Sequence, residues 1–273
     1  MRAWEIIDIS YPDLVRDWTF DPAAALVIVV LAATWLLLVR RHPGWARTRT
    51  IAAVGALAAA VVATQSGVAT HDTDSLTAHV LQHVLLGMLL PLLVALAAPV
   101  TLVLQSAHPS TRRVVRRWLR HPLVAVISHP LVGFVAFAAS LVVLTFSPLL
   151  DVAARSDGVH LLVHVHLVLV GALFVWPLVG VDPMPERPGH GARLLIVFAS
   201  VPFHAFVGVA LLSATTTMFD AYPSLDDQRR AAGLLWGAGE LFTLAVAAVV
   251  FVDWFRAEQR AGRRHDRQME SSG

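Results

Sequence analysis

Residues 75–104 read SLTAHVLQHVLLGMLLPLLVALAAPVTLVL, an apolar run that contains no charged residue. About 20 apolar residues in a helix suffice to cross a bilayer, so this stretch predicts a transmembrane helix. His79 and His83 lie near its start, four residues apart and therefore on one face of that helix. Ionisable side chains inside a membrane segment are costly and usually face a partner, a cavity or an ion.

Six further apolar stretches have a similar length. The chain has 273 residues, of which 56% are hydrophobic and 15% charged, against about 25% charged in soluble domains. We therefore expect an all-α fold, a bundle of seven transmembrane helices in one integral membrane domain that covers residues 1–273. The spans are expected near residues 22–39, 50–66, 79–104, 123–146, 158–180, 194–214 and 231–252. Pro91 and Pro99 predict a kink or an early end in the third span.

Arginine is unevenly divided between the loops that join these spans. Loops 40–49 and 105–122 hold four and five arginines, five more follow residue 253, and loop 67–78 holds none. Basic residues concentrate on the cytoplasmic side of membrane proteins. The sequence therefore predicts an N-terminus outside the cell and a cytoplasmic C-terminus, with a polar, frayed tail over residues 256–273.

A second histidine pair, His160 and His164, occurs at the start of the fifth span, in VHLLVHVHLV. The third and fifth spans both begin on the predicted outer side, so the two pairs are expected at the same depth. Neutral imidazoles are common metal ligands, and a pair at i and i+4 can hold one ion from one helix. Two facing pairs would complete one four-coordinate site or build a site for two metals. Interfacial histidines that bind headgroups or loops are the alternative.

Two other ionisable side chains are predicted deeper in the membrane. His204 lies near the middle of the sixth span, and Glu240 lies inside the seventh. Each is either a deeper part of a metal site or a hydrogen-bonded structural residue. The chain has no cysteine, which excludes thiolate ligands. Met88 is five residues after His83 and is expected on a different face of the helix.

The predicted outer loops are acidic. Asp72 and Asp74 precede the first histidine pair, and Asp151 and Asp157 precede the second. Such a rim attracts cations. The arginine clusters on the other side are interpreted as contacts with lipid headgroups, not with nucleic acid. The sequence also contains no Walker loop, GxSxG elbow or dinucleotide-binding fingerprint.

Several motifs occur in the order found in one membrane protein family. Besides residues 75–104 they are VHVHLVLVGALFVWPLVGVDPMP, PFHAFVGVALL and LDDQRRAAGLLWGAGEL. Over about residues 18–255 the chain resembles the CtaG-type cytochrome c oxidase assembly proteins, multi-pass proteins of the bacterial plasma membrane. The resemblance implies a non-enzymatic role in maturing haem–copper oxidase, with copper handled at the outer face of the membrane. The implied partners are oxidase subunits, copper donor proteins and membrane lipid.

By motif, the resemblance gives functional weight to His79, Gln82, His83, His164, His204 and the pair Asp227 and Gln228. Together with the spacing argument, it leads us to expect one or two copper ions. The expected metal ligands are His79, His83, His160 and His164, with His204 and Glu240 as deeper ligands or neighbours of ligands. Two alternatives stay open: a membrane enzyme with a histidine-rich dimetal centre, and a carrier of b-type haem. A homodimer is also compatible with the sequence.

Overall fold

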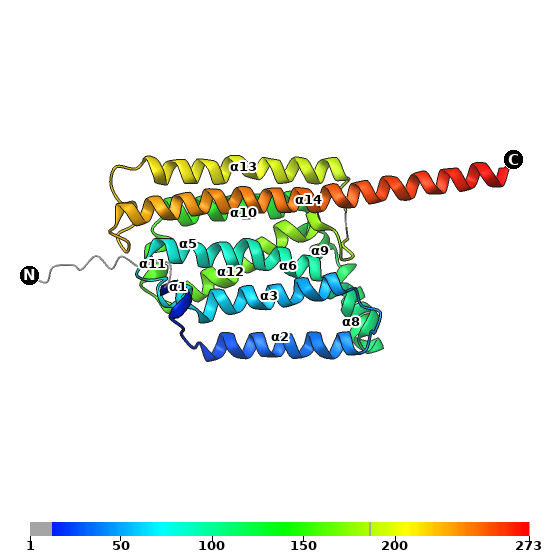
Figure 1. Ribbon diagram of the computed structural model, residues 1–273, viewed down its shortest axis with the longest axis horizontal. Helices are drawn as coiled ribbons and strands as arrows, with labels where there is room; N and C mark the ends of the chain where they lie inside the picture. The colour runs from blue at the N-terminus through cyan, green and yellow to red at the C-terminus, as the bar shows by residue number, and fades with distance from the viewer. Residues whose placement is uncertain (1–12, 186, 273) are drawn as a thin grey trace, which may run out of the picture.

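Figure 1 shows the computed structural model of the chain, which describes residues 13–185 and 187–272. Every regular element in these residues is a helix, and none is a strand, as expected for an all-α fold. Six helical stretches among them are long and apolar enough to cross a membrane, which supports a multi-pass membrane protein. They are α2 (Pro22–Arg40), α3 (Arg47–Gln65), Leu76–Ser106, α12 (Asp157–Val179), α13 (His190–Ser213) and α14 (Leu225–Ser272).

The predicted span near residues 123–146 is divided into two helices, α9 (Pro122–Ile127) and α10 (Pro130–Phe146). Pro130 has no backbone N–H and starts a new helix, and the side chain of His129 caps it by accepting a hydrogen bond from the Leu131 amide. Helix α10 has 17 residues, or about 25 Å, which is shorter than the ~30 Å of a hydrocarbon core. The described helices thus give six candidate spans and one shorter apolar helix, so the count of seven stays a prediction.

The long third stretch is interrupted at both of its prolines. In the α-helix that the sequence predicts, Pro91 would clash with the carbonyl four residues earlier, and a π turn just before it relieves the clash. Ala98, directly before Pro99, is left-handed with φ 58° and ends the helix. The parts of the stretch are α5 (Leu76–Val84), the π turn η1 (Leu85–Leu89), α6 (Leu90–Ala97) and α7 (Pro99–Ser106).

The long helices pack side by side, with α2 at one edge of the bundle and α13 and α14 at the other (Figure 1). Between them, α12 packs against η1, α6 and α10. Gly171 permits the contact with η1, because a Cβ at this position would overlap the carbonyl oxygen of Gly87. Phe137 and Phe174 stack at 4.7 Å in the core, and Phe242 of α14 packs on both. This packing sets α12 beside α5.

The remaining helices are short: α1 (Asp13–Arg16), α4 (Gly67–Thr70), α8 (Pro109–Leu119) and α11 (Leu149–Ala154).

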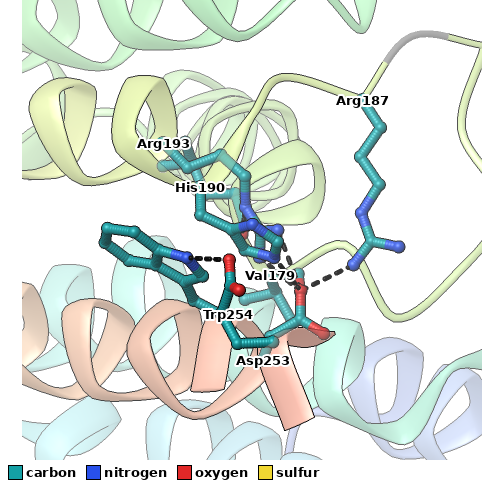
Figure 2. Close-up of polar contacts among 8 residues, drawn as sticks. Val179, Arg187, His190, Arg193, Asp253 and Trp254 are labelled. Atoms are coloured by element: carbon teal, nitrogen blue, oxygen red, sulfur yellow. Dashed lines mark hydrogen bonds and ion pairs between the residues drawn. The ribbon is translucent and has the colours of Figure 1, made fainter. Parts of the chain in front are cut away.

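A buried arginine joins three helices at the C-terminal end of α12 (Figure 2). Arg193 is 1% exposed and donates to two backbone oxygens in the last turn of α12 and, at 2.9 Å, to Asp253 of α14. Asp253 also pairs with Arg187 at 2.8 Å and with His190 at 3.3 Å. Beyond Asp253, α14 continues as a helix to Ser272 and leaves the bundle (Figure 1), so the tail that was predicted to be frayed is helical.

Candidate metal centre

The two histidine pairs meet where α5 and α12 begin. The rings of His79 and His83 have centroids 4.2 Å apart, and those of His160 and His164 are also 4.2 Å apart. Between the helices, His79 lies 5.0 Å from His160 in a nearly parallel stack, and His83 lies 5.7 Å from His164. The structure therefore brings the two predicted pairs together, and we call these four residues the histidine cluster.

Three members of the histidine cluster have ring nitrogens that converge. One nitrogen each from His79, His83 and His160 lies within 4.8 Å of the other two. In all three residues Nε2 is buried and has no hydrogen-bond partner. Buried polar atoms in proteins are nearly always paired, so three histidines that each have a converging ring nitrogen and an unpaired Nε2 suit a bound metal ion. No other set of three histidine or acidic side chains converges in this way in residues 13–185 and 187–272.

The orientation of His79 is fixed by two acceptors at its other nitrogen. Its Nδ1 lies 3.0 Å from the carbonyl oxygen of Asp72 and 2.8 Å from the hydroxyl of Tyr222. That hydroxyl donates its own proton to the same Asp72 carbonyl at 2.6 Å, so it accepts from His79. Burial raises the pKa of the Tyr222 hydroxyl above its ordinary value, which keeps it protonated. We infer that the ring proton lies on Nδ1, which leaves the Nε2 lone pair free for a metal.

A carboxylate lies at the edge of the three nitrogens. Asp72 is 8% exposed, and its Oδ2 is 3.9 Å from Nε2 of His160. Burial raises the pKa of the Asp72 carboxyl, and the nearby His160 opposes this shift. The sequence placed Asp72 only in an acidic rim, but the structure places it where it can serve as an oxygen ligand or bind an arriving cation.

His164 has a different partner from the other three histidines. Its Nε2 bonds to Oε1 of Gln82 at 2.8 Å, and Nε2 of Gln82 donates to the carbonyl oxygen of Ala63 at 2.9 Å. This chain of bonds joins α12, α5 and α3. His164 therefore lies in the histidine cluster without contributing one of its three converging nitrogens.

The two deeper residues, His204 and Glu240, are not among the residues whose nitrogens converge. His204 on α13 is fully buried, packs at 5.6 Å on the ring of Phe137, and places Nδ1 3.2 Å from the carbonyl oxygen of Ser200. Its ring covers Gly239 of α14, where a Cβ would overlap it. Glu240, the next residue on α14, interacts electrostatically with His204. The structure thus places neither residue in the converging set, and their part in a metal site stays a prediction.

Asp227 at the start of α14 holds the start of α5. Its carboxylate accepts hydrogen bonds from the amides of Leu76 at 2.6 Å and Thr77 at 3.3 Å. The hydroxyls of Ser75 and Thr77 also donate to it, at 3.2 and 2.5 Å. A carboxylate at a helix N-terminus satisfies the free amides and favours the helix dipole. Asp227 therefore fixes the first turn of the helix that carries His79 and His83.

Gln228 holds the loop that carries Tyr222. It is fully buried, accepts from the amide of Met218 at 2.7 Å and donates to the carbonyl oxygen of Leu211 at 3.1 Å. The resemblance named Asp227 and Gln228 without a role, and the structure gives both a positioning role. Tyr222 itself was missed, because it comes from a loop far away in the sequence and follows no helical spacing.

Comparison with known proteins assigns the chain to a family. Residues 26–257 match the family described as cytochrome c oxidase caa3 assembly factor (Caa3_CtaG). Uncharacterized proteins of Mycobacterium bovis and Mycobacterium tuberculosis are 34% identical over 98% of the chain, and one of Mycobacterium leprae is 32% identical over 99%. The chain spans 45% of the length of these relatives. No solved structure matches it. The match over most of its length shows that the chain belongs to the Caa3_CtaG family of cytochrome c oxidase assembly factors.

Proposed function

We propose that this chain serves oxidase assembly by holding copper in the histidine cluster and passing it to cytochrome c oxidase. The observation that carries the proposal is the convergence of three buried nitrogens without hydrogen-bond partners, on His79, His83 and His160. Imidazole nitrogens suit copper, because Cu(II) binds them more tightly than the other divalent first-row metals do.

The arrangement also suits exchange of the ion. Three protein nitrogens leave at least one position open in a four-coordinate site, where a donor or acceptor group can enter. Asp72 lies at the edge of the nitrogens and is the natural first contact for an arriving cation. Tyr222 keeps the ring of His79 in place while the ion comes and goes. One ion fits the three nitrogens, and a second would need further ligands from the neighbouring residues.

A b-type haem suits the histidine cluster less well. The rings of His79 and His160 stack directly at 5.0 Å, which leaves no room for a porphyrin between them. Dimetal oxygenases usually hold their metals with several carboxylates, whereas the carboxylate at the edge of the histidine cluster is that of Asp72, 3.9 Å from His160.

The proposed placement in the membrane follows from the arginines. With the arginine-rich loops 40–49 and 105–122 in the cytoplasm, the histidine cluster lies near the outer face of the bacterial plasma membrane. Helix α10 would then form a seventh crossing together with α9, and the end of α14 would lie in the cytoplasm. Residues 1–12, whose predicted position is outside the cell, lie outside the described part of the chain. Oxidase subunits and copper donor proteins are the proposed partners, and a homodimer agrees with this arrangement.

The copper content of the oxidase in cells with and without this chain tests the proposal. Oxidase purified from cells that lack the chain should contain its haem but little copper, and expression of the chain should restore the copper. Copper and iron are measured by mass spectrometry on the same samples. Oxidase with its full copper content in the absence of the chain would contradict the proposal.

A further inference from the structure

A cavity of about 80 Å³ lies inside the bundle beside the histidine cluster. Residues of α5, η1, α10, α12, α13 and α14 form its wall, and most of them are aliphatic, such as Val80, Leu144, Val170 and Leu211. His83 belongs both to this wall and to the three converging nitrogens. The cavity and the proposed metal site therefore share a side chain.

Few polar atoms line the cavity, and most of them are bonded within the protein. The hydroxyls of Ser140 and Thr145 donate to carbonyl oxygens four residues earlier in α10, at 2.7 and 2.9 Å. His83 differs, because its buried Nε2 has no hydrogen-bond partner. Met88, which is 6% exposed, adds a thioether sulfur to the same wall. The wall of the cavity thus contains one imidazole with an unpaired nitrogen and one thioether side chain.

The π turn explains how Met88 reaches the cavity. Five residues along an α-helix rotate a side chain by about 140°, which is why the sequence placed Met88 on a different face from His83. In η1 the Leu90 amide bonds to the Leu85 carbonyl, five residues away, so one extra residue enters the turn. The wider turn lowers the rotation between residues 83 and 88, and both line the cavity. The structure corrects the expectation that Met88 faces away from His83.

We propose that His83 and Met88 form a second metal subsite, which accepts the soft monovalent cation Cu(I). This inference rests on the proposed function, because it names the form of copper that the chain handles. Thioether sulfur selects Cu(I) over harder divalent ions. The aliphatic wall adds to this selectivity, since burying a doubly charged ion costs more than burying a singly charged one. Because His83 belongs to both sites, an ion can move between them without losing every protein ligand.

X-ray absorption at the selenium edge tests the subsite directly. The full chain has five methionines, and selenomethionine-labelled protein loaded with Cu(I) should show copper as a neighbour of selenium. Met88→Leu should remove this signal while nearly conserving side-chain volume. Met184→Leu, in the loop between α12 and α13, is the matched control and should retain it. Met88→Leu should also weaken Cu(I) binding about tenfold and leave Zn(II) binding unchanged.

The outcomes separate this inference from the proposed function. If the protein binds Cu(I) without a selenium–copper signal, or keeps the signal in Met88→Leu, the subsite is wrong and copper binding by the histidine cluster stands. If the protein binds neither Cu(I) nor Cu(II), both proposals are wrong. Equal loss of Zn(II) and Cu(I) binding in Met88→Leu would also overturn the subsite, because it would show that Met88 does not select Cu(I).

Discussion

Copper bound to the purified protein should fall to background when His83 and His160 are both replaced by alanine. Only His79 would remain of the three converging nitrogens, and one imidazole cannot hold copper against competing chelators. Changing a group that merely supports a metal ligand costs about 10- to 100-fold in affinity, so removing two ligands should cost more than about 100-fold. Competition titration with a chromophoric Cu(I) chelator measures the affinity, and mass spectrometry measures the metal content.

His166→Ala is the matched control for this experiment. His166 lies on the same helix, two residues after His164, but its Nε2 bonds to the hydroxyl of Ser140 at 2.7 Å on the side of α10. This variant should bind copper as the unchanged protein does. Copper binding that survives in the variant with both His83 and His160 replaced would mean that the site lies elsewhere in the chain.

Asp227→Ala should destabilise the protein and weaken copper binding together. The carboxylate accepts hydrogen bonds from two amides and two hydroxyls at the start of α5. Hydrogen bonds to a charged group each contribute about 1.5–3 kcal/mol, so the loss of four of them should lower the free energy of unfolding by at least about 3 kcal/mol. Because the first turn of α5 positions His79 and His83, copper affinity should fall about 10- to 100-fold. Thermal unfolding in detergent and the chelator titration measure the two effects.

Asp226→Ala controls for the loss of a negative charge at the start of α14. Its side chain is 81% exposed and forms a surface ion pair with Arg229 at 3.7 Å. Exposed pairs of this kind contribute little, so its unfolding free energy should change by less than about 0.5 kcal/mol. Equal effects of the two substitutions on copper binding would show that Asp227 acts only through its charge on the rim.

Much of the fold could be predicted because it depends on periodicity and length. The i, i+4 spacing of His79 with His83 and of His160 with His164 predicted that each pair shares a face, and the equal depth of the pairs predicted that they meet. Both expectations agree with the ring distances. The apolar stretches located the long helices for the same reason, since a span needs about 20 apolar residues.

The parts that could not be predicted depend on tertiary contacts or on local departures from the α-helix. Tyr222 and the buried Asp72 reach the histidine cluster from loops, where no spacing rule applies. The π turn shifts Met88 relative to His83, and helical periodicity assumes that no such turn occurs. Arg193 is buried and bonded to the end of α12, a contact that no spacing in the sequence indicates.

Anomalous diffraction at the copper edge, from crystals of the copper-loaded protein, would locate the bound ion. We expect a strong peak about 2 Å from Nε2 of His79, His83 and His160, the usual bond length between a metal and an imidazole nitrogen. Nδ1 of His79 should remain bonded to Tyr222 in that structure. A copper peak away from these three residues, with their Nε2 atoms bonded to protein groups instead, would show that the histidine cluster does not bind copper.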